Sequence, residues 1–386
     1  MKRNLFLFSG ILALSLTANA QELKEEYMTW PNSQGLGEYA SQWTPGEYLF
    51  EDENFYISRV KPKARFRNAN TQINETLTEE TDKNLVFWVP IGTASGGNPN
   101  ARPNGKFDSE VFSMWSYVTH YGNWTAPQGW VPGGFADAAH KNGVGVSGVA
   151  SIPWGSLSSD WATALDNMSK NATIREKVAK FLHYHGVDGL GYNSEFNTSN
   201  TTMLSNVRAL NEEVHKYLTE QGNPVAENFW YDGTNDNGQI NFDQGLGSHN
   251  NETFGDGEHI RTSLFLNYNW WGTPLSTFNT GTINSQAPGR SLLDLYAGFN
   301  MQGGDPSTWT LLEDYNVSIG LWGAHDFNML WADRANYGST DMSKQLGYQN
   351  VIEQFFSNGR RNPIDKIAVF DRGSHHPNEG WFGMSA

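Results

Sequence analysis

The chain contains no cysteine among its 386 residues. Disulfide bonds, thiolate metal sites, a cysteine nucleophile and a lipid anchor on cysteine are therefore all excluded for this sequence. Positive charge is also scarce, because 26 Lys and Arg face 41 Asp and Glu and give a formal net charge of −15. Such a charge argues against a nucleic-acid phosphate backbone as the partner. After the first residues, no apolar run is long enough for a membrane helix.

Aromatic residues, in contrast, are abundant. The sequence holds 15 Trp, 15 Tyr and 22 Phe, which is more than a core of this size usually needs. We therefore expect some of these rings to line a binding surface. Sugars suit such a surface, because their C–H faces stack on the apolar faces of aromatic rings.

The first twenty residues, MKRNLFLFSGILALSLTANA, have a basic start, then an apolar run, and then small residues typical of a cleavage site at Ala18-Asn19-Ala20. This pattern is typical of a cleavable secretory signal peptide. The apolar run is too short to span a bilayer permanently. We therefore expect residues 1–20 to be removed, and the mature protein to be soluble and either secreted or periplasmic.

Apolar runs of strand length recur along the rest of the chain, and helical patterns lie between several of them. Gly143, Gly186 and Gly222 follow three of these helical patterns, as glycines at helix ends do. The eight runs are 84–92, 111–122, 144–153, 186–196, 224–232, 262–271, 291–300 and 316–324. Strand followed by helix, eight times over, predicts an α/β fold of the (β/α)8 TIM-barrel type. A doubly wound sheet would need a G-x-G-x-x-G turn after its first strand, and GTASGGNPN lacks that pattern.

We assign residues 21–363 to this barrel, which begins with a polar, irregular N-terminal segment. Residues 364–386 contain the strand-like run KIAVFD from 366 onward. This short β-like tail either packs back on the barrel or begins a further β segment.

The fourth predicted strand carries the strongest signal for chemistry. Gly189 and Gly191 share the inward parity of this strand and leave room in the barrel interior. Asn193 and Glu195 follow on the same parity, near the carboxyl end where barrel enzymes hold their catalytic residues. We expect the amide and the acid to stand side by side in the pocket. The alternative is that both cap the strand and face water, which leaves the two glycines unexplained.

One carboxylate beside an amide suggests a particular way of cleaving glycosidic bonds. Most glycosidases use two carboxyl groups, but an N-acetylated sugar can supply its own nucleophile, the acetamido oxygen, and form an oxazoline. Asn193 can hold the acetamido group while Glu195 protonates the departing oxygen. If Glu227 or Asp232 supplied a second carboxylate near the next strand, the enzyme would be a conventional retaining glycosidase. Asp188 has the opposite parity, and we expect it to cap or pair outside the barrel interior.

These residues resemble a known family. The segment DGLGYNSE is similar to the D-G-x-x-x-N-x-E strand of glycoside hydrolase family 85, the endo-β-N-acetylglucosaminidases. Chitinase-like family 18 enzymes carry D-G-x-D-x-D-x-E instead, and here Gly191 replaces the second of those acids. Further resemblances fall in family order across roughly residues 30–360: GWVPGGFADAAHKNGVGVSG, ENFWYDGTNDNGQINF, LFLNYNWW and LLDLYAGFNMQGG.

The resemblance implies a role for each matching residue. Asn193 would orient and stabilise the acetamido group or oxazoline, and Glu195 would act as general acid and then as the base for water. Tyr231 would help to hold the same acetamido group. The residues expected at the sugar sites are Phe242, Asn267, Trp270 and Trp271. Apart from the resemblance, Trp322 is expected there from its place at the end of the eighth predicted strand, with core packing as the alternative.

The activity that the resemblance implies is hydrolysis of the GlcNAc-β-1,4-GlcNAc bond in the chitobiose core of Asn-linked glycans. The anomeric configuration would be retained, no metal or cofactor is implied, and N-linked glycans or glycoproteins would be the partners. Phe242 stands where the family has tryptophan, and Asn300 where an acid is common. These departures leave open the glycan class and the capacity for transglycosylation. A family 18-like hydrolase and a carbohydrate-binding barrel without catalysis remain alternatives.

Overall fold

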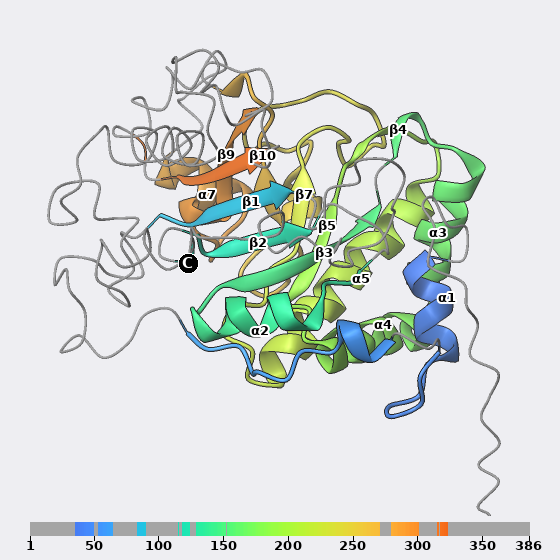
Figure 1. The fold of residues 1–386 in the computed structure, drawn as a ribbon. Helices are drawn as coiled ribbons and strands as arrows, with labels where there is room; N and C mark the ends of the chain where they lie inside the picture. Colours follow the sequence, from blue (N-terminus) through green and yellow to red (C-terminus); the bar gives the residue numbers. More distant parts are fainter. Residues whose placement is uncertain are drawn as a thin grey trace, which may run out of the picture.

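The fold is a closed barrel of parallel strands in the order β1-β10-β9-β8-β7-β5-β3-β2 (Figure 1). The computed structural model describes residues 35–49, 53–64, 83–89, 115, 118–123, 129–151, 153–270, 279–300, 315 and 317–322. The barrel strands are β1 (Leu85–Val89), β2 (His120–Asn123), β3 (Gly145–Ser151), β5 (Gly189–Tyr192), β7 (Phe229–Tyr231), β8 (Ser263–Phe265), β9 (Leu295–Asn300) and β10 (Ser318–Trp322). Each overlaps one predicted run, so the predicted (β/α)8 barrel is confirmed. The predicted signal peptide and the predicted tail lie outside the described residues.

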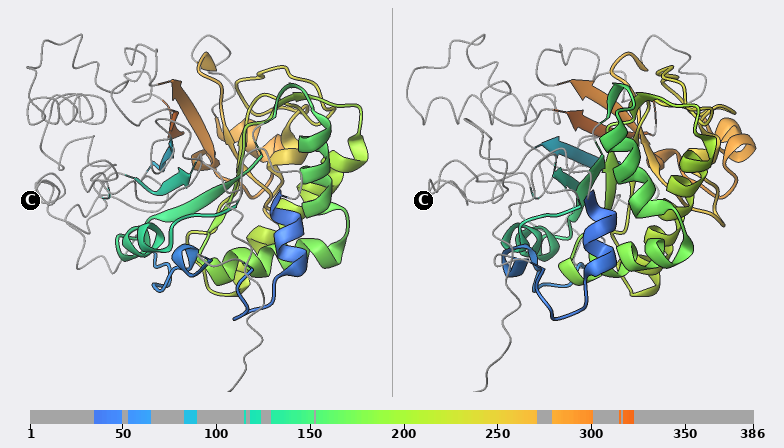
Figure 2. Two further views of the ribbon diagram at one scale, coloured as in Figure 1. Left: turned by 45° about the vertical axis from the view of Figure 1, so that its right-hand side comes forward. Right: turned by 90° about the vertical axis from the view of Figure 1, so that its right-hand side faces the viewer.

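Helices alternate with the strands and cover the barrel. Within the described residues, the α-helices are α1 (Gly35–Gln42), α2 (Gly133–Lys141), α3 (Ser159–Ser169), α4 (Ala172–His185), α5 (Thr201–Glu220), α6 (Asn251–Phe254) and α7 (Thr280–Gln286), and the 3-10 helices include η1 (Glu53–Tyr56) and η6 (Leu292–Asp294). Helix α1, early in the chain, packs against α3 and α4 (Figures 1 and 2). Of the helices that the structure describes, none has the length and apolar character needed to cross a membrane.

Local signals in the sequence explain where these helices begin and end. The side chain of Asn171 accepts a hydrogen bond from the Ile174 N–H at the start of α4, and Asn200 does the same for α5. Such N-caps satisfy a backbone donor that has no partner within the helix. Gly186 ends α4 in the left-handed conformation, with φ of 73°, which glycine adopts without steric cost.

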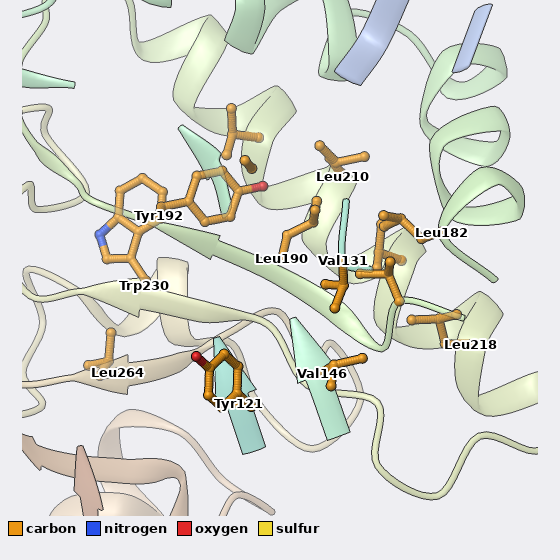
Figure 3. Close-up of a cluster of buried hydrophobic side chains, with 14 of the residues drawn as sticks. Tyr121, Val131, Val146, Leu182, Leu190, Tyr192, Leu210, Leu218, Trp230 and Leu264 are labelled. Atoms are coloured by element: carbon orange, nitrogen blue, oxygen red, sulfur yellow. The ribbon is translucent and has the colours of Figure 1, made fainter. Parts of the chain in front are cut away.

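The main apolar core lies between the strands and the helices. Leu190 and Tyr192 of β5 point into it, where they meet residues such as Leu182 and Leu210 (Figure 3). The Tyr192 hydroxyl donates to Asn211 Oδ1 over 2.8 Å, so its polar end is satisfied inside this core. Burial of such side chains is the main favourable contribution to folding.

A second apolar cluster consists of strand residues only and fills the barrel interior. Its members are Val86, Trp88, Phe229, Tyr231, Phe265 and Tyr296. Large rings there face glycines on other strands: a Cβ built on Gly122 would lie 2.0 Å from Trp88, and one on Gly320 would lie 2.2 Å from Phe265. The interior is therefore a packed core, as TIM barrels require, and not a channel.

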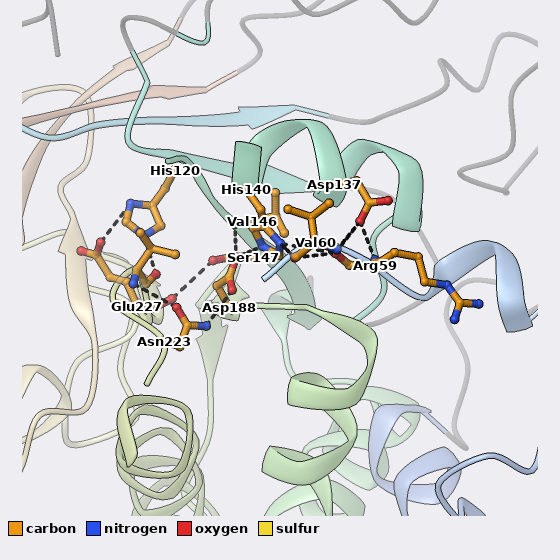
Figure 4. Close-up of polar contacts among 12 residues, drawn as sticks. Arg59, Val60, His120, Asp137, His140, Val146, Ser147, Asp188, Asn223 and Glu227 are labelled. Atoms are coloured by element: carbon orange, nitrogen blue, oxygen red, sulfur yellow. Dashed lines mark hydrogen bonds and ion pairs between the residues drawn. The ribbon is translucent and has the colours of Figure 1, made fainter. Parts of the chain in front are cut away.

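Asp188, just before β5, belongs to a buried polar network outside the barrel interior (Figure 4). Its Oδ2 accepts from His140 Nε2 at 2.8 Å and from the Val146 N–H at 2.7 Å. Its Oδ1 accepts from Asn223 Nδ2 at 2.7 Å. The prediction that Asp188 pairs outside the interior is confirmed, and its bonds join α2, β3 and the segment between α5 and β7.

Candidate active site at the carboxyl end of the barrel

Asn193 and Glu195 lie side by side beyond the carboxyl end of β5, as predicted. The Asn193 Nδ2 donates to Glu195 Oε2 over 3.0 Å and to the Pro153 carbonyl over 3.2 Å. The Asn193 backbone N–H donates to Ser151 O over 2.9 Å. Both side chains are half-buried. The amide is therefore fixed by β3 and the following segment, and it in turn orients the acid.

The chain path at this point differs from the prediction of one strand over 186–196. Strand β5 ends at Tyr192, and Glu195 begins β6 (Glu195–Asn197), which pairs with β4 (Trp154–Ser156) outside the barrel. Ser194 lies at this change of direction, where its hydroxyl donates to Tyr231 O and its carbonyl accepts from the Thr234 hydroxyl. These bonds anchor the segment carrying Glu195 to the end of β7.

Tyr231, the last residue of β7, lies close to this pair and is fixed by three neighbours. Its hydroxyl accepts from Asn267 Nδ2 over 2.8 Å. Its ring centroid lies 6.0 Å from that of Phe242 and 5.9 Å from that of Tyr268. Burial, and then the negative charge of Glu195, raises the pKa of the Tyr231 phenol. The phenol therefore stays protonated and available as a hydrogen-bond donor.

Phe242 reaches the site through an unusual backbone conformation. Its φ is 46°, in the left-handed region, which costs a residue other than glycine about 1–2 kcal/mol. A Cβ built on Gly233 would lie 3.3 Å from Glu195 Cγ and 3.3 Å from the Phe242 ring. The same Cβ would lie only 2.5 Å from Ser194 O, so glycine at 233 allows the Ser194–Glu195 backbone and the Phe242 ring to pack closely here. Backbone strain of this kind is typical of functional sites.

The two other carboxylates considered from the sequence are occupied elsewhere. Glu227 precedes β7, at the amino end of the barrel, and accepts from Ser263 Oγ at 2.6 Å and from the Tyr296 hydroxyl at 2.8 Å (Figure 4 shows its contact with His120). Asp232 follows β7 but is buried and accepts from the Gln244 N–H and from Asn250 Nδ2. Burial raises the pKa of both carboxyl groups. Neither is arranged as a second catalytic carboxylate beside Glu195.

The predicted sugar-contacting residues have different outcomes. Trp270 is fully buried, its indole N–H donates to Gly298 O over 2.9 Å, and its ring packs against Phe299. The prediction that Trp270 lines a sugar site is therefore wrong, because this ring is part of the core. Trp271 lies outside the described residues. Trp322 is half-buried at the end of β10, against the interior cluster, and its contact with sugar stays a prediction.

Tyr268 was not among the predicted site residues, although it lies within the segment LFLNYNWW. Its ring packs on Tyr231 and, at 6.4 Å between centroids, on Phe265. Its position next to Asn267 was the only signal in the sequence. Over the part of the chain that the structure describes, no three His, Asp or Glu side chains are grouped so as to bind a metal ion.

The fold and the acid–amide pair at its carboxyl end define the class: a (β/α)8 glycoside hydrolase. The chain belongs to glycosyl hydrolase family 85, whose sequence profile matches residues 97–377. The resemblance found in the strand motifs is thereby confirmed.

One of the solved structures to which the chain is similar supports the fold. The glycoside hydrolase domain of Endo-D (Spr0440) from Streptococcus pneumoniae R6 is similar with a TM-score of 0.65 and 21% identity, over 88% of this chain and 52% of that chain. The chain thus spans about half the length of that structure. A family 18 chitinase from Flavobacterium johnsoniae has a TM-score of 0.36 and 12% identity, over 63% of this chain and 87% of that one. No curated protein sequence matches the chain.

Proposed function

We propose that this protein is an endo-β-N-acetylglucosaminidase that hydrolyses the GlcNAc-β-1,4-GlcNAc bond in the chitobiose core of Asn-linked glycans. The reaction retains the anomeric configuration and uses the substrate's own acetamido oxygen as nucleophile. The observation that carries the proposal is the 3.0 Å hydrogen bond between the Asn193 amide and the Glu195 carboxylate, beside the protonated phenol of Tyr231. Membership of family 85 supports the same activity.

The hydrogen bonds of Asn193 suggest how the acetamido group is held. Its amide nitrogen donates to Glu195 Oε2 and to Pro153 O, so its carbonyl oxygen is the group that it offers to a ligand. An amide carbonyl can accept the acetamido N–H and orient the acetamido oxygen toward the anomeric carbon. Stabilisation of the charge that develops on the acetamido group favours the oxazolinium over the ground state.

Glu195 then has two tasks in sequence. As the acetamido oxygen bonds to the anomeric carbon, the glycosidic C–O bond breaks and Glu195 gives its proton to the leaving oxygen. In the second step the carboxylate takes a proton from water, which attacks the anomeric carbon and opens the oxazoline ring. Two inversions give overall retention. Tyr231 donates a hydrogen bond from its hydroxyl to the acetamido oxygen or to the oxazoline that replaces it, and keeps its proton.

The surroundings of the other carboxylates support substrate assistance over a conventional retaining mechanism. A conventional retaining enzyme needs two carboxyl groups about 5–5.5 Å apart across the scissile bond. Glu227 is bound by Ser263 and Tyr296 at the amino end of the barrel, and Asp232 is bound by the loop after β7. Because both are engaged in this way, neither is placed to act as the nucleophile, which supports the acetamido oxygen in that role.

The decisive experiment is mass spectrometry of a high-mannose glycoprotein after incubation with the wild-type enzyme or with Glu195→Gln. We expect the wild type to leave one GlcNAc at each site and the variant to leave the glycoprotein intact. Cleavage by Glu195→Gln at a rate near that of the wild type would refute the assignment of the acid. Binding without cleavage of high-mannose, hybrid and complex glycans by the wild type would instead indicate a carbohydrate-binding barrel.

We further propose that the protein acts outside the cytoplasm, on glycoproteins or free glycans that it meets there. The signal-peptide pattern of residues 1–20 supports this location. The size of the culture-supernatant or periplasmic protein, compared with the full-length chain, tests it.

A further inference from the structure

Asp232 is a buried carboxylate directly after Tyr231, and its hydrogen bonds reach two separate parts of the site. It is only 4% exposed. It accepts from the Gln244 backbone N–H and from Asn250 Nδ2 in the loop after β7. The backbone N–H of Asn267, just beyond β8, also faces this carboxyl group and lowers its pKa, against the larger effect of burial. One side chain thus joins the loop after β7 to the end of β8.

The first of these connections bears on Phe242. Phe242 and Gln244 both have left-handed backbone conformations, with φ of 46° and 59°. Two such residues within three positions need external bonds to hold them, because each conformation is unfavourable by itself. The Gln244 N–H bond to Asp232 and the bond from the Asn241 N–H to Gly233 O at 2.8 Å supply them. The Phe242 ring consequently stays 6.0 Å from the Tyr231 ring.

The second connection bears on Tyr231 itself. The Asn267 side chain donates to the Tyr231 hydroxyl over 2.8 Å, and the Asn267 backbone N–H faces the Asp232 carboxyl group. Rotation or displacement of Asn267 would leave the Tyr231 hydroxyl without this donor. Phe242 and Asn267, which contact Tyr231 by different groups, are thus both tied to one carboxylate.

We propose that Asp232 is a positioning residue that holds Phe242 and Asn267 against Tyr231, and that it acts on glycan binding and cleavage only through them. The inference rests on the proposed function and deepens it. Asp232 does not touch the reacting atoms. Its carboxylate keeps the Phe242 ring and the Asn267 side chain in contact with Tyr231, and so keeps the Tyr231 hydroxyl beside Asn193 and Glu195.

The test uses Asp232→Asn in the full chain. Asparagine keeps the shape of the side chain, but its NH2 group replaces one carboxylate oxygen and must face a donor, either the Gln244 N–H or Asn250 Nδ2. Kd is measured by titration calorimetry with a high-mannose glycopeptide in a Glu195→Gln background, and kcat/KM is measured in the active enzyme. The same substitution is then made in the Phe242→Ala/Asn267→Ala background. The matched control is Asp236→Asn, at a half-buried aspartate of the same loop that accepts from the Glu252 and Thr253 N–H groups instead.

We expect Asp232→Asn to lower kcat/KM and weaken binding about ten-fold, the size expected for one lost charge-assisted hydrogen bond. In the Phe242→Ala/Asn267→Ala background we expect a further change of less than about two-fold, since contacts that act as one unit are not additive. Asp236→Asn should leave both quantities within about two-fold of wild type. All assays run well below the lowest Tm of the set, so that unfolding does not contribute.

Two results would overturn the inference. One is a full ten-fold effect of Asp232→Asn in the Phe242→Ala/Asn267→Ala background, which would show that Asp232 acts by another route. The other is an equal loss from Asp236→Asn, which would show a general effect of loop stability. A wild-type chain that neither cleaves nor binds any glycopeptide would instead refute the proposed function, and this inference with it.

Discussion

The indole ring of Trp88 occupies the space that Gly191 leaves inside the barrel. A Cβ built on Gly191 would lie 2.0 Å from Trp88 Cη2 and 2.5 Å from Cζ2, and the same ring approaches Gly122 through Cε3. Gly191 is two residues before Asn193, so this contact forms part of the packed layer beneath the acid–amide pair. The glycine therefore serves the packing of a large ring and not the admission of a ligand.

Gly191→Ala should consequently destabilise the protein. A contact of 2.0 Å cannot be relieved without moving the ring or the strand, and overpacking of this kind costs about 1–3 kcal/mol. Urea unfolding measures the change in free energy. Gly134→Ala is the control, because a Cβ there meets nothing within 4 Å. If both variants had the same stability as wild type, the close packing of Trp88 on Gly191 would be disproved. A smaller loss in a Trp88→Phe background would confirm that the ring is the obstacle.

The barrel could be predicted from the sequence because its signals are local. Apolar runs of strand length and glycines at helix ends mark the elements whatever the tertiary contacts. Asn193 and Glu195 were also predictable, because strand parity brings residues two apart to one face. That argument did not show that the chain turns at Ser194, since the hydroxyl bond to Tyr231 O connects residues far apart in sequence.

The position of Trp270 could not be predicted from the sequence. An aromatic pair after a barrel strand looks the same in sequence whether a ring faces sugar or core. Only the tertiary structure shows that the Trp270 N–H has a carbonyl partner, Gly298 O, on the neighbouring strand. The bonds of Asp232 to Gln244 and Asn267 were likewise invisible, because spacing along the chain does not encode which loop N–H groups a carboxylate will meet.

Trp270→Phe should lower stability and leave glycan binding unchanged. The substitution removes the hydrogen bond to Gly298 O and part of a fully buried ring, which together cost about 1–3 kcal/mol. Thermal unfolding reports the loss, and titration with a high-mannose glycopeptide in the Glu195→Gln background reports binding. Trp322→Phe is the comparison, since Trp322 is half-buried at the rim. If Trp270→Phe bound the glycopeptide more weakly at a temperature where the variant is fully folded, Trp270 would be shown to contact the glycan after all.

Asn193→Ala should slow oxazoline formation more than oxazoline hydrolysis. The amide stabilises charge that develops as the acetamido oxygen attacks, and loss of one such donor or acceptor costs roughly 100–1000-fold in rate. A preformed glycan oxazoline already has the bond that Asn193 helps to form. Cleavage of a glycopeptide and hydrolysis of the oxazoline are compared for wild type and variant. An equal loss in both reactions would mean that Asn193 serves mainly to orient Glu195.

His140 should make the protein more stable at mildly acidic pH. Burial alone disfavours the charged imidazole, but the Asp188 carboxylate, the bond to Val60 O and the charge of Asp137 outweigh it and raise the pKa of His140 above 6.5. Both ring nitrogens face acceptors, since Nδ1 lies 2.6 Å from Val60 O and Nε2 lies 2.8 Å from Asp188 Oδ2. The folded state thus binds the proton more tightly than the unfolded chain.

The sign of the pH dependence follows from linkage. The stabilisation by protonated His140 is fully present below the unfolded pKa of about 6.5 and is lost as pH rises through the higher folded pKa. The difference in unfolding free energy between wild type and His140→Gln should therefore shrink from pH 6 to pH 8.5.

His215 provides a control of opposite sign. Burial, and then the charge of Arg290, lowers the pKa of His215 to about 4. As pH falls from about 7 toward 4, the unfolded chain binds a proton at this position that the folded chain does not, so wild type should lose stability relative to His215→Gln. Denaturant titrations at pH 5, 6, 7 and 8.5 measure both differences. A His140→Gln difference that stayed constant with pH would show that the His140–Asp188 contact is a neutral hydrogen bond, with no ion pair at the junction of α2 and β5.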